Sequence, residues 1–215
     1  MKICVLGAGA LGCAVGGVLT EAGHEVWLVN RGQAHVDAMR KQGLTMRESG
    51  VDRVVKVRAS TDCREIAQAA GLMDLIIVLV KSYHTREAIA AALPIVGADT
   101  VVLSLQNGLG HEDVLAEVVG RERVLAGKTY AGGVMLAPGH IIVGTRNKET
   151  LIGEIDGSNS ERVRRVAEVF NRAGLVTQVS LNILGTMWDK LLINVATGAV
   201  SGIRLSMTDP NQAWD

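Results

Sequence analysis

A glycine-rich segment near the N-terminus has the residue types and spacing of a phosphate-binding turn. The segment Gly7-Ala8-Gly9-Ala10-Leu11-Gly12 fits the pattern G-x-G-x-x-G, follows a short apolar run and precedes a stretch with helical character. In such a turn Gly7 permits the tight bend, Gly9 lets the backbone approach a pyrophosphate, and Gly12 lets the helix pack closely on the strand. The alternative is a plain strand-to-helix turn whose glycines occur by chance, since the chain has 25 Gly in 215 residues.

Asn30 and Arg31 end the next predicted strand, Glu25–Val29, about 20 residues after the glycine turn, where a dinucleotide site reads the ribose of its ligand. An acidic residue at this point binds a ribose 2′-hydroxyl and disfavours a 2′-phosphate. A neutral Asn followed by Arg favours the phosphate, because a guanidinium can bind phosphate through two hydrogen bonds. The sequence therefore favours NADP over NAD, with a simple surface-turn role for Arg31 as the alternative.

Polar residues also follow two later apolar runs. Lys81 comes directly after Asp74–Val80, and Asn107 comes soon after Val101–Leu105. Ligands of open α/β sheets bind beyond the carboxyl ends of the strands, so both side chains are expected near the nicotinamide end of a dinucleotide. The alternatives are a solvated loop lysine and ordinary turn chemistry for Asn-Gly. His84 is expected to cap a helix.

A polar stripe marks the apolar helix predicted over Thr186–Ile203. Lys190 and Asn194 are four residues apart and therefore share one face of this helix. A buried helix carries a Lys and an Asn on one stripe when they meet a partner or a ligand. A lysine that extends its ammonium into solvent, beside a locally hydrogen-bonded Asn, is the alternative.

The elements that must position these residues alternate between short apolar runs and amphipathic stretches up to about residue 123, which predicts a doubly wound α/β domain. A strand over Val54–Arg58 belongs to this part. Three short strands beyond it are expected to extend the sheet with antiparallel pairing: Val134–Leu136, His140–Val143 and Leu151–Ile155. We predict one mostly parallel domain over residues 1–183 and the start of an all-helical domain over 184–215.

Composition excludes several classes of protein. The chain has 22 Lys+Arg and 22 Asp+Glu, and its six aromatic residues offer little for base stacking, which argues against a nucleic-acid partner. Cys4, Cys13 and Cys63 are scattered without the spacing of metal ligands. The sequence contains no apolar stretch of membrane-spanning length and no secretory signal pattern. We therefore expect a cytoplasmic protein without a metal site and without a membrane partner.

Four motifs together resemble the ketopantoate reductases (2-dehydropantoate 2-reductases). They are Lys2–Gly12, Asp74–Lys81, the tetrapeptide Leu105–Gly108, and the spacing Trp188-x-Lys190-x-x-x-Asn194. They occur in the order found in the family. The first motif is shared by many Rossmann proteins, whereas the last three together are fairly specific.

This resemblance implies a Rossmann domain and NADPH-dependent reduction of a 2-keto acid, ketopantoate, to a 2-hydroxy acid in pantothenate biosynthesis. Lys190 is similar to the family's general acid, and Asn194 to a substrate-binding residue. Asn107 resembles the asparagine that contacts both cofactor and substrate. Ala131 resembles a backbone contact to the cofactor, and Arg31 and Lys81 resemble contacts to the NADP phosphate and the cofactor. Family members also often form homodimers.

The sequence departs from the family pattern in two places. Gly198 stands where the family often has a second Asn, which leaves the identity of the keto acid open. The family also continues with further helices that contribute substrate-binding and catalytic residues, so the resemblance implies a truncated chain. Two alternatives therefore stay open: a related hydroxyacid dehydrogenase with another small substrate, and a catalytically incomplete NADP-binding fragment.

Overall fold

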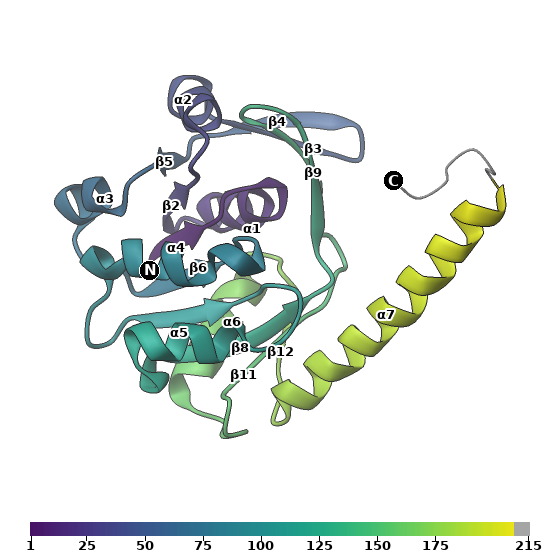
Figure 1. The fold of residues 1–215 in the computed structure, drawn as a ribbon. Helices are drawn as coiled ribbons and strands as arrows, with labels where there is room; N and C mark the ends of the chain where they lie inside the picture. The colour runs from purple at the N-terminus through teal and green to yellow at the C-terminus, as the bar shows by residue number, and fades with distance from the viewer. Residues whose placement is uncertain (209–215) are drawn as a thin grey trace.

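A large, mostly parallel β-sheet forms the centre of the molecule in the computed structural model, which describes the backbone of residues 1–208 and the side chains of 1–193, 195 and 196 (Figure 1). Its strand order is β12-β11-β8-β7-β6-β1-β2-β5. All neighbouring strands in it run parallel except β8 and β11. The strands are β1 (Lys2–Leu6), β2 (Glu25–Val29), β5 (Arg58–Ser60), β6 (Leu75–Val78), β7 (Val101–Ser104), β8 (Val124–Thr129), β11 (Thr150–Gly153) and β12 (Thr177–Val179). The predicted doubly wound α/β fold is confirmed.

Helices cover both faces of this sheet, which is why its central strands are almost wholly apolar. One core contains side chains of α1 (Ala10–Glu21), α2 (Gln33–Gln42) and α6 (Glu161–Arg172), and the opposite core contains side chains of α3 (Cys63–Ala70), α4 (Thr85–Ala91) and α5 (His111–Val119). Short 3-10 turns lie at Ser82–His84, Leu93–Ile95 and Arg121–Arg123. The carboxyl ends of β1, β2, β6 and β7 consequently open on one edge between the two helix layers.

A second sheet of four strands lies beside α1 and α2, in the order β4-β3-β10-β9 (Figure 1). Its strands are β3 (Leu44–Glu48), β4 (Val51–Val55), β9 (Gly132–Ala137) and β10 (His140–Gly144). The prediction that Val134–Leu136 and His140–Val143 extend the main sheet was therefore wrong. Only the third predicted strand, at Leu151, extends it, through antiparallel pairing of β11 with β8.

The physical reason is a pairing between distant segments. β10 runs parallel to β3, which places His140 opposite Thr45. The β3–β4 hairpin was not expected, and the single strand predicted over Val54–Arg58 is divided between β4 and β5. The apolar side chains of β3 are buried against α1 and not within the main sheet.

The last helix, α7 (Ile183–Thr208), begins three residues before its predicted start, where Gly185 N–H donates to the side-chain oxygen of Asn182. Its first turns pack on β8 and β11, and the rest of the helix runs along the side of the molecule (Figure 1). The division into domains at residue 183 remains a prediction. Within residues 1–208, no helix has both the length and the apolar character needed to cross a membrane.

Candidate active site

The glycine turn between β1 and α1 has the geometry of a phosphate-binding loop. Gly7 adopts φ +98°, and a side chain there would start 2.6 Å from the backbone of Leu79. A side chain on Gly12 would start 2.3 Å from the carbonyl oxygen of Gly7. At Gly9, by contrast, no protein atom lies within 4 Å of that position. Gly7 and Gly12 are therefore required by the fold, whereas the space beside Gly9 is left open at the start of a helix, where N–H groups lack intrahelical acceptors.

Two polar side chains hold this turn through the carbonyl oxygen of Ala8. Asn30 Nδ2 donates to it at 2.8 Å, and His35 Nε2 lies 3.0 Å from it. His35 Nδ1 accepts the N–H of Gly139, so the same ring ties the β9–β10 turn to the glycine turn. This arrangement requires a neutral imidazole, and burial lowers the pKa of His35 accordingly. No local sequence pattern indicates this role of His35.

A cleft of about 820 Å³ begins at the glycine turn and follows the carboxyl ends of the strands. Most of the predicted cofactor residues line it: Gly7, Gly9, Ala10, Leu11, Gly12, Arg31, Lys81 and Asn107. Ala8 and Ala131 are not part of its lining; Ala8 is buried, and the N–H of Ala131 donates to Thr129 Oγ1 at 3.0 Å. A cleft of this size, with an open glycine and a helix start at one end, fits a dinucleotide.

Residues that follow β2 and β5 form one end of the cleft, and Arg31 lies there. Its guanidinium is 2.6 Å from His84 Nε2 and 3.6 Å from a carboxylate oxygen of Glu87. His84 Nδ1 lies 3.2 Å from that same carboxylate, which completes a chain of three side chains. His84 occupies the N-cap position of α4, as expected, but its side chain makes no capping bond and instead contacts Arg31.

Gln106 and Asn107, which follow β7, connect the cleft to the last helix. Gln106 Nε2 donates to Val80 O at 3.0 Å and to Thr85 Oγ1 at 2.8 Å, so it fixes the loop that carries Lys81. Asn107 lines both the cleft and a second, small cavity next to α7. Its carbonyl oxygen is held by His111 Nε2 at 2.9 Å.

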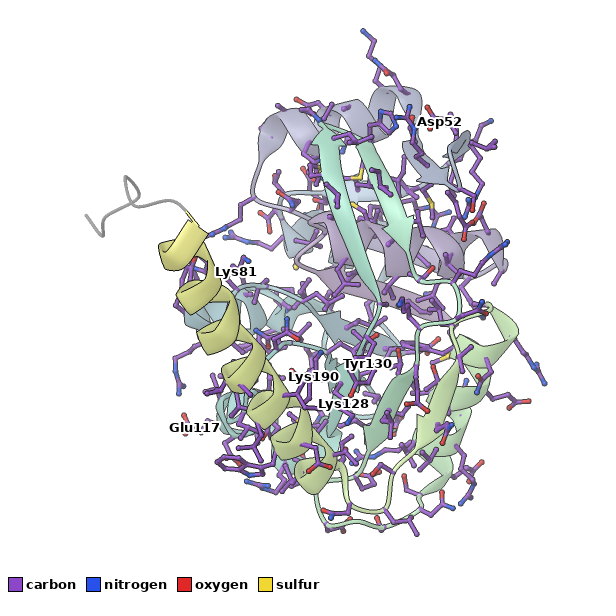
Figure 2. All side chains as sticks on the ribbon, turned by 90° about the vertical axis from the view of Figure 1, so that its right-hand side faces the viewer. Asp52, Lys81, Glu117, Lys128, Tyr130 and Lys190 are labelled. Atoms are coloured by element: carbon purple, nitrogen blue, oxygen red, sulfur yellow. The ribbon has the colours of Figure 1, made fainter. Side chains whose placement is uncertain are left out.

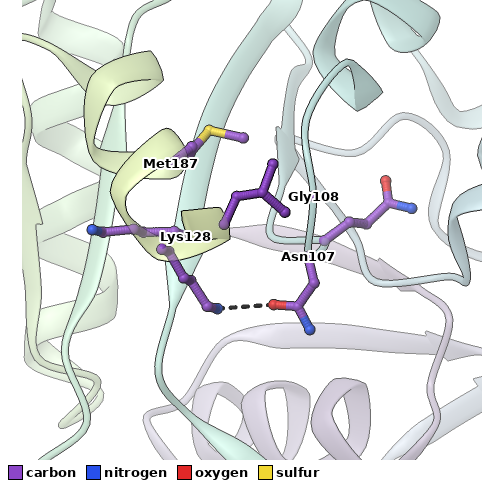
Figure 3. A pocket seen from close by; sticks show the side chains of 7 residues that line it. Asn107, Gly108, Lys128 and Met187 are labelled. Atoms are coloured by element: carbon purple, nitrogen blue, oxygen red, sulfur yellow. Dashed lines mark hydrogen bonds between the residues drawn. The ribbon is translucent and has the colours of Figure 1, made fainter. Parts of the chain in front are cut away.

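The ammonium of Lys190 reaches this same point from α7. Its Nζ donates to Asn107 Oδ1 at 2.8 Å, the bond drawn as a dashed line in Figure 3. It also donates to the carbonyl oxygen of Thr129 at 2.6 Å. Burial lowers the pKa of Lys190, and the nearby positive charge of Lys128 lowers it further. A lysine of this kind can donate a proton more readily than a solvated one.

Lys128 and Tyr130 were missed in the sequence, and both lie next to Lys190 (Figure 2). The Lys190 ammonium is 5.4 Å from the centroid of the Tyr130 ring, and the Lys128 ammonium is 5.5 Å from it. These residues escaped notice because the strand β8 was not predicted at all. Asn194, together with Thr197, Gly198 and Ser201, lies outside the residues whose side chains the structure describes, so its role in substrate binding remains a prediction.

The described part of the chain contains no candidate metal site. Among those residues, no group of three or more His, Cys, Asp or Glu side chains is placed to hold a metal ion.

Comparison with known proteins gives a consistent result. The family described as "Ketopantoate reductase PanE/ApbA" matches residues 3–157. A 2-dehydropantoate 2-reductase of Pyrococcus horikoshii is 42% identical over 204 residues, which are 94% of this chain and 64% of that protein. The corresponding enzyme of Halobacterium salinarum is 37% identical, again over 94% of this chain and 65% of that protein. The chain thus spans slightly less than two thirds of the length of these relatives.

Solved structures agree with the sequence relatives. A 2-dehydropantoate 2-reductase from Geobacter metallireducens superposes with a TM-score of 0.82 at 28% identity, covering 91% of this chain and 63% of that one. A D-mandelate dehydrogenase, solved with NADH and anilino(oxo)acetate, also gives a TM-score of 0.82, at 26% identity over 90% of this chain and 61% of that one. From its sequence and its fold, the chain belongs to the ketopantoate reductase PanE/ApbA family.

Proposed function

We propose that this protein carries out the NADPH-dependent reduction of ketopantoate to pantoate, with Lys190 as the general acid, as a cytoplasmic enzyme of pantothenate biosynthesis. The observation that carries the proposal is the position of the Lys190 ammonium, which bonds to Asn107, a residue that lines both the long cleft and the small cavity beside α7. The names of the relatives support the same substrate. The three cysteines are free and buried, which suits a reducing compartment.

Residues of the chain donate the proton that this reaction needs. When bound, NADPH supplies the hydride that adds to the keto carbon. The oxygen of that carbonyl gains negative charge at the same time, and the Lys190 ammonium donates a proton to it and stabilises the charge. Asn107 holds the ammonium by its side-chain oxygen, so the acid is oriented before the substrate arrives. Asn194 is the proposed partner of the substrate's remaining polar groups.

The remaining cofactor contacts are assigned by their place in the cleft. The N–H groups at the start of α1, next to Gly9, bind the pyrophosphate, and Lys81 lies along the same cleft. Arg31 binds the 2′-phosphate. Its present partner Glu87 is exposed, and exposed ion pairs contribute only about 0–1 kcal/mol, so exchanging that carboxylate for a phosphate costs little. Ala131 remains a proposed backbone contact.

A second candidate function is a hydroxyacid dehydrogenase for another small keto acid. The likeness to D-mandelate dehydrogenase favours it, because that protein was solved with NADH and an oxoacetate compound on the same fold. Gly198, which replaces a frequent Asn of the family, points in the same direction. A third outcome is a fragment that binds NADP without turnover. The formation of a homodimer remains a prediction.

A steady-state assay separates these functions. We expect NADPH oxidation that depends on ketopantoate, at a kcat/KM at least about tenfold above that for phenylglyoxylate or pyruvate, in line with discrimination by one pocket. A preference for another keto acid supports the dehydrogenase. NADPH binding without turnover on any keto acid supports the binding fragment. Failure to bind NADPH would contradict the proposal that the cleft binds a dinucleotide.

A further inference from the structure

Lys128 is a buried lysine to which the proposed reaction assigns no role. Only 8% of its surface is exposed, and it lies on β8, whose six residues are all buried. Side chains two apart on a strand share a face, so Lys128 points to the same side as Ala126, which packs against Ile183 and Met187 of α7. Its ammonium donates to the carbonyl oxygen of Thr186 at 2.7 Å. Lys128 therefore joins the central sheet to the first turns of α7.

The carbonyl oxygen that accepts from Lys128 belongs to the helical turn that carries Lys190. In an α-helix the N–H of residue i bonds to the carbonyl of residue i−4, so the Thr186 oxygen is the helical acceptor for Lys190. Lys190 itself bonds to the carbonyl oxygen of Thr129, the residue after Lys128. The two lysines thus cross-link β8 and α7 in both directions, one from the strand to the helix and one from the helix to the strand.

Both ammonium groups also share one environment. They line the same small cavity, and each lies within 5.5 Å of the centroid of the Tyr130 ring (Figure 2). Contact with an aromatic ring partly offsets the loss of hydration of a buried cation. Two further titratable groups lie close to the lysines: the Tyr130 phenol and the His111 imidazole that holds Asn107. Among the described side chains, no carboxylate forms an ion pair with either lysine.

We propose that Lys128 is a positioning residue for Lys190: it fixes the helical turn that carries Lys190 and places a second positive charge in the same cavity. The proposal rests on the proposed role of Lys190 as the acid. Repulsion between like charges makes the protonated form of Lys190 less stable, which agrees with its lowered pKa. The consequence is a stronger acid for proton transfer to the substrate oxygen, held in place from the sheet.

The test measures the protonation of Lys190 directly, without requiring turnover. Brief acetylation with acetic anhydride modifies only neutral amines, so the pH dependence of labelling of the Lys190 peptide, followed by mass spectrometry, gives its pKa. The exposed Lys56 serves as the internal reference. In Lys128→Met we expect the titration of Lys190 to move upward by about one pH unit, the effect of removing a nearby like charge. Lys128→Arg, which keeps the charge and the donor, should leave it near the wild-type position.

Lys148→Met is the matched control, because it removes one lysine charge from an exposed site. An unchanged Lys190 titration in folded Lys128→Met, or an equal shift in Lys148→Met, would overturn the proposal. If Lys128→Met does not fold, Lys128→Gln takes its place; unfolding of both variants would assign Lys128 a purely structural role and would also overturn it. An enzyme without turnover that still shows the shift contradicts the proposed function and leaves the coupling of the two lysines standing.

Discussion

The Lys190 ammonium lies 2.8 Å from the side-chain oxygen of Asn107, although 83 residues separate the two in the chain. One residue follows a central strand of the sheet, and the other is on the last helix. Asn107 lines the long cleft, and this bond joins it to the lysine that we propose as the proton donor.

Replacing Lys190 should separate chemistry from cofactor binding. In Lys190→Met we expect kcat for ketopantoate reduction to fall by about 10²–10⁴-fold, the usual contribution of a positioned acid. The Kd for NADPH should change less than about twofold on the same reasoning, because Lys190 does not line the main cleft. Stopped-flow turnover and fluorescence titration measure the two quantities. Lys148→Met is the control, and a Lys190→Met enzyme with more than a tenth of wild-type kcat would contradict the acid role.

The lowered pKa of Lys190 predicts opposite pH profiles for the two directions of the reaction. Reduction needs the ammonium form, so its kcat should fall as the pH rises through the Lys190 pKa, and this fall should begin below the range of an ordinary lysine. Oxidation of pantoate needs the neutral amine, so its kcat should rise through the same pKa. Profiles measured in both directions with the same buffers test this. Two limbs with clearly different midpoints would show that another group controls the proton.

Arg31 should decide between the two nicotinamide cofactors. Arg31→Gln removes the proposed contact to the 2′-phosphate, and a charge-assisted hydrogen bond contributes about 1.5–3 kcal/mol, so NADPH binding should weaken about 10–100-fold. NADH binding should stay the same, because NADH has no 2′-phosphate. Isothermal titration with both cofactors gives the ratio, and Arg172→Gln, an exposed arginine on α6, is the control. Equal weakening for both cofactors would place Arg31 outside the phosphate site.

Two glycines of the turn should respond in opposite ways. Gly9 is the N-cap of α1 and has open space around it, so Gly9→Asp should keep or raise the melting temperature, because Asp is a favoured N-cap. Its carboxylate would occupy the proposed pyrophosphate site and should weaken NADPH binding by at least about tenfold.

Gly12→Ala is the matched comparison for Gly9→Asp. Its new methyl group would start 2.3 Å from the Gly7 oxygen, so we expect a loss of about 1–3 kcal/mol in the free energy of unfolding. Urea denaturation and cofactor titration of both variants check the pair. Retained NADPH affinity in folded Gly9→Asp would show that the phosphates bind elsewhere.

Features that depend on neighbouring residues could be predicted from the sequence. The glycine turn, the apolar strands next to it and the pattern around Lys190 are local signals, because a positive φ, burial on both faces and helical spacing each leave a trace within a few residues. The predicted doubly wound fold and most of the cleft residues follow from such signals.

The pairing of distant segments, by contrast, could be seen only in the folded chain. The pairing of β10 with β3 and the position of β8 depend on contacts across many residues, and such contacts leave no local pattern. The second half of the strand with Lys128, Gly127-Lys128-Thr129, has small and polar residues that resemble a loop when read alone. A role for Lys128 can be inferred only from the fold, because the sheet buries this side chain under α7, beside the ammonium of Lys190.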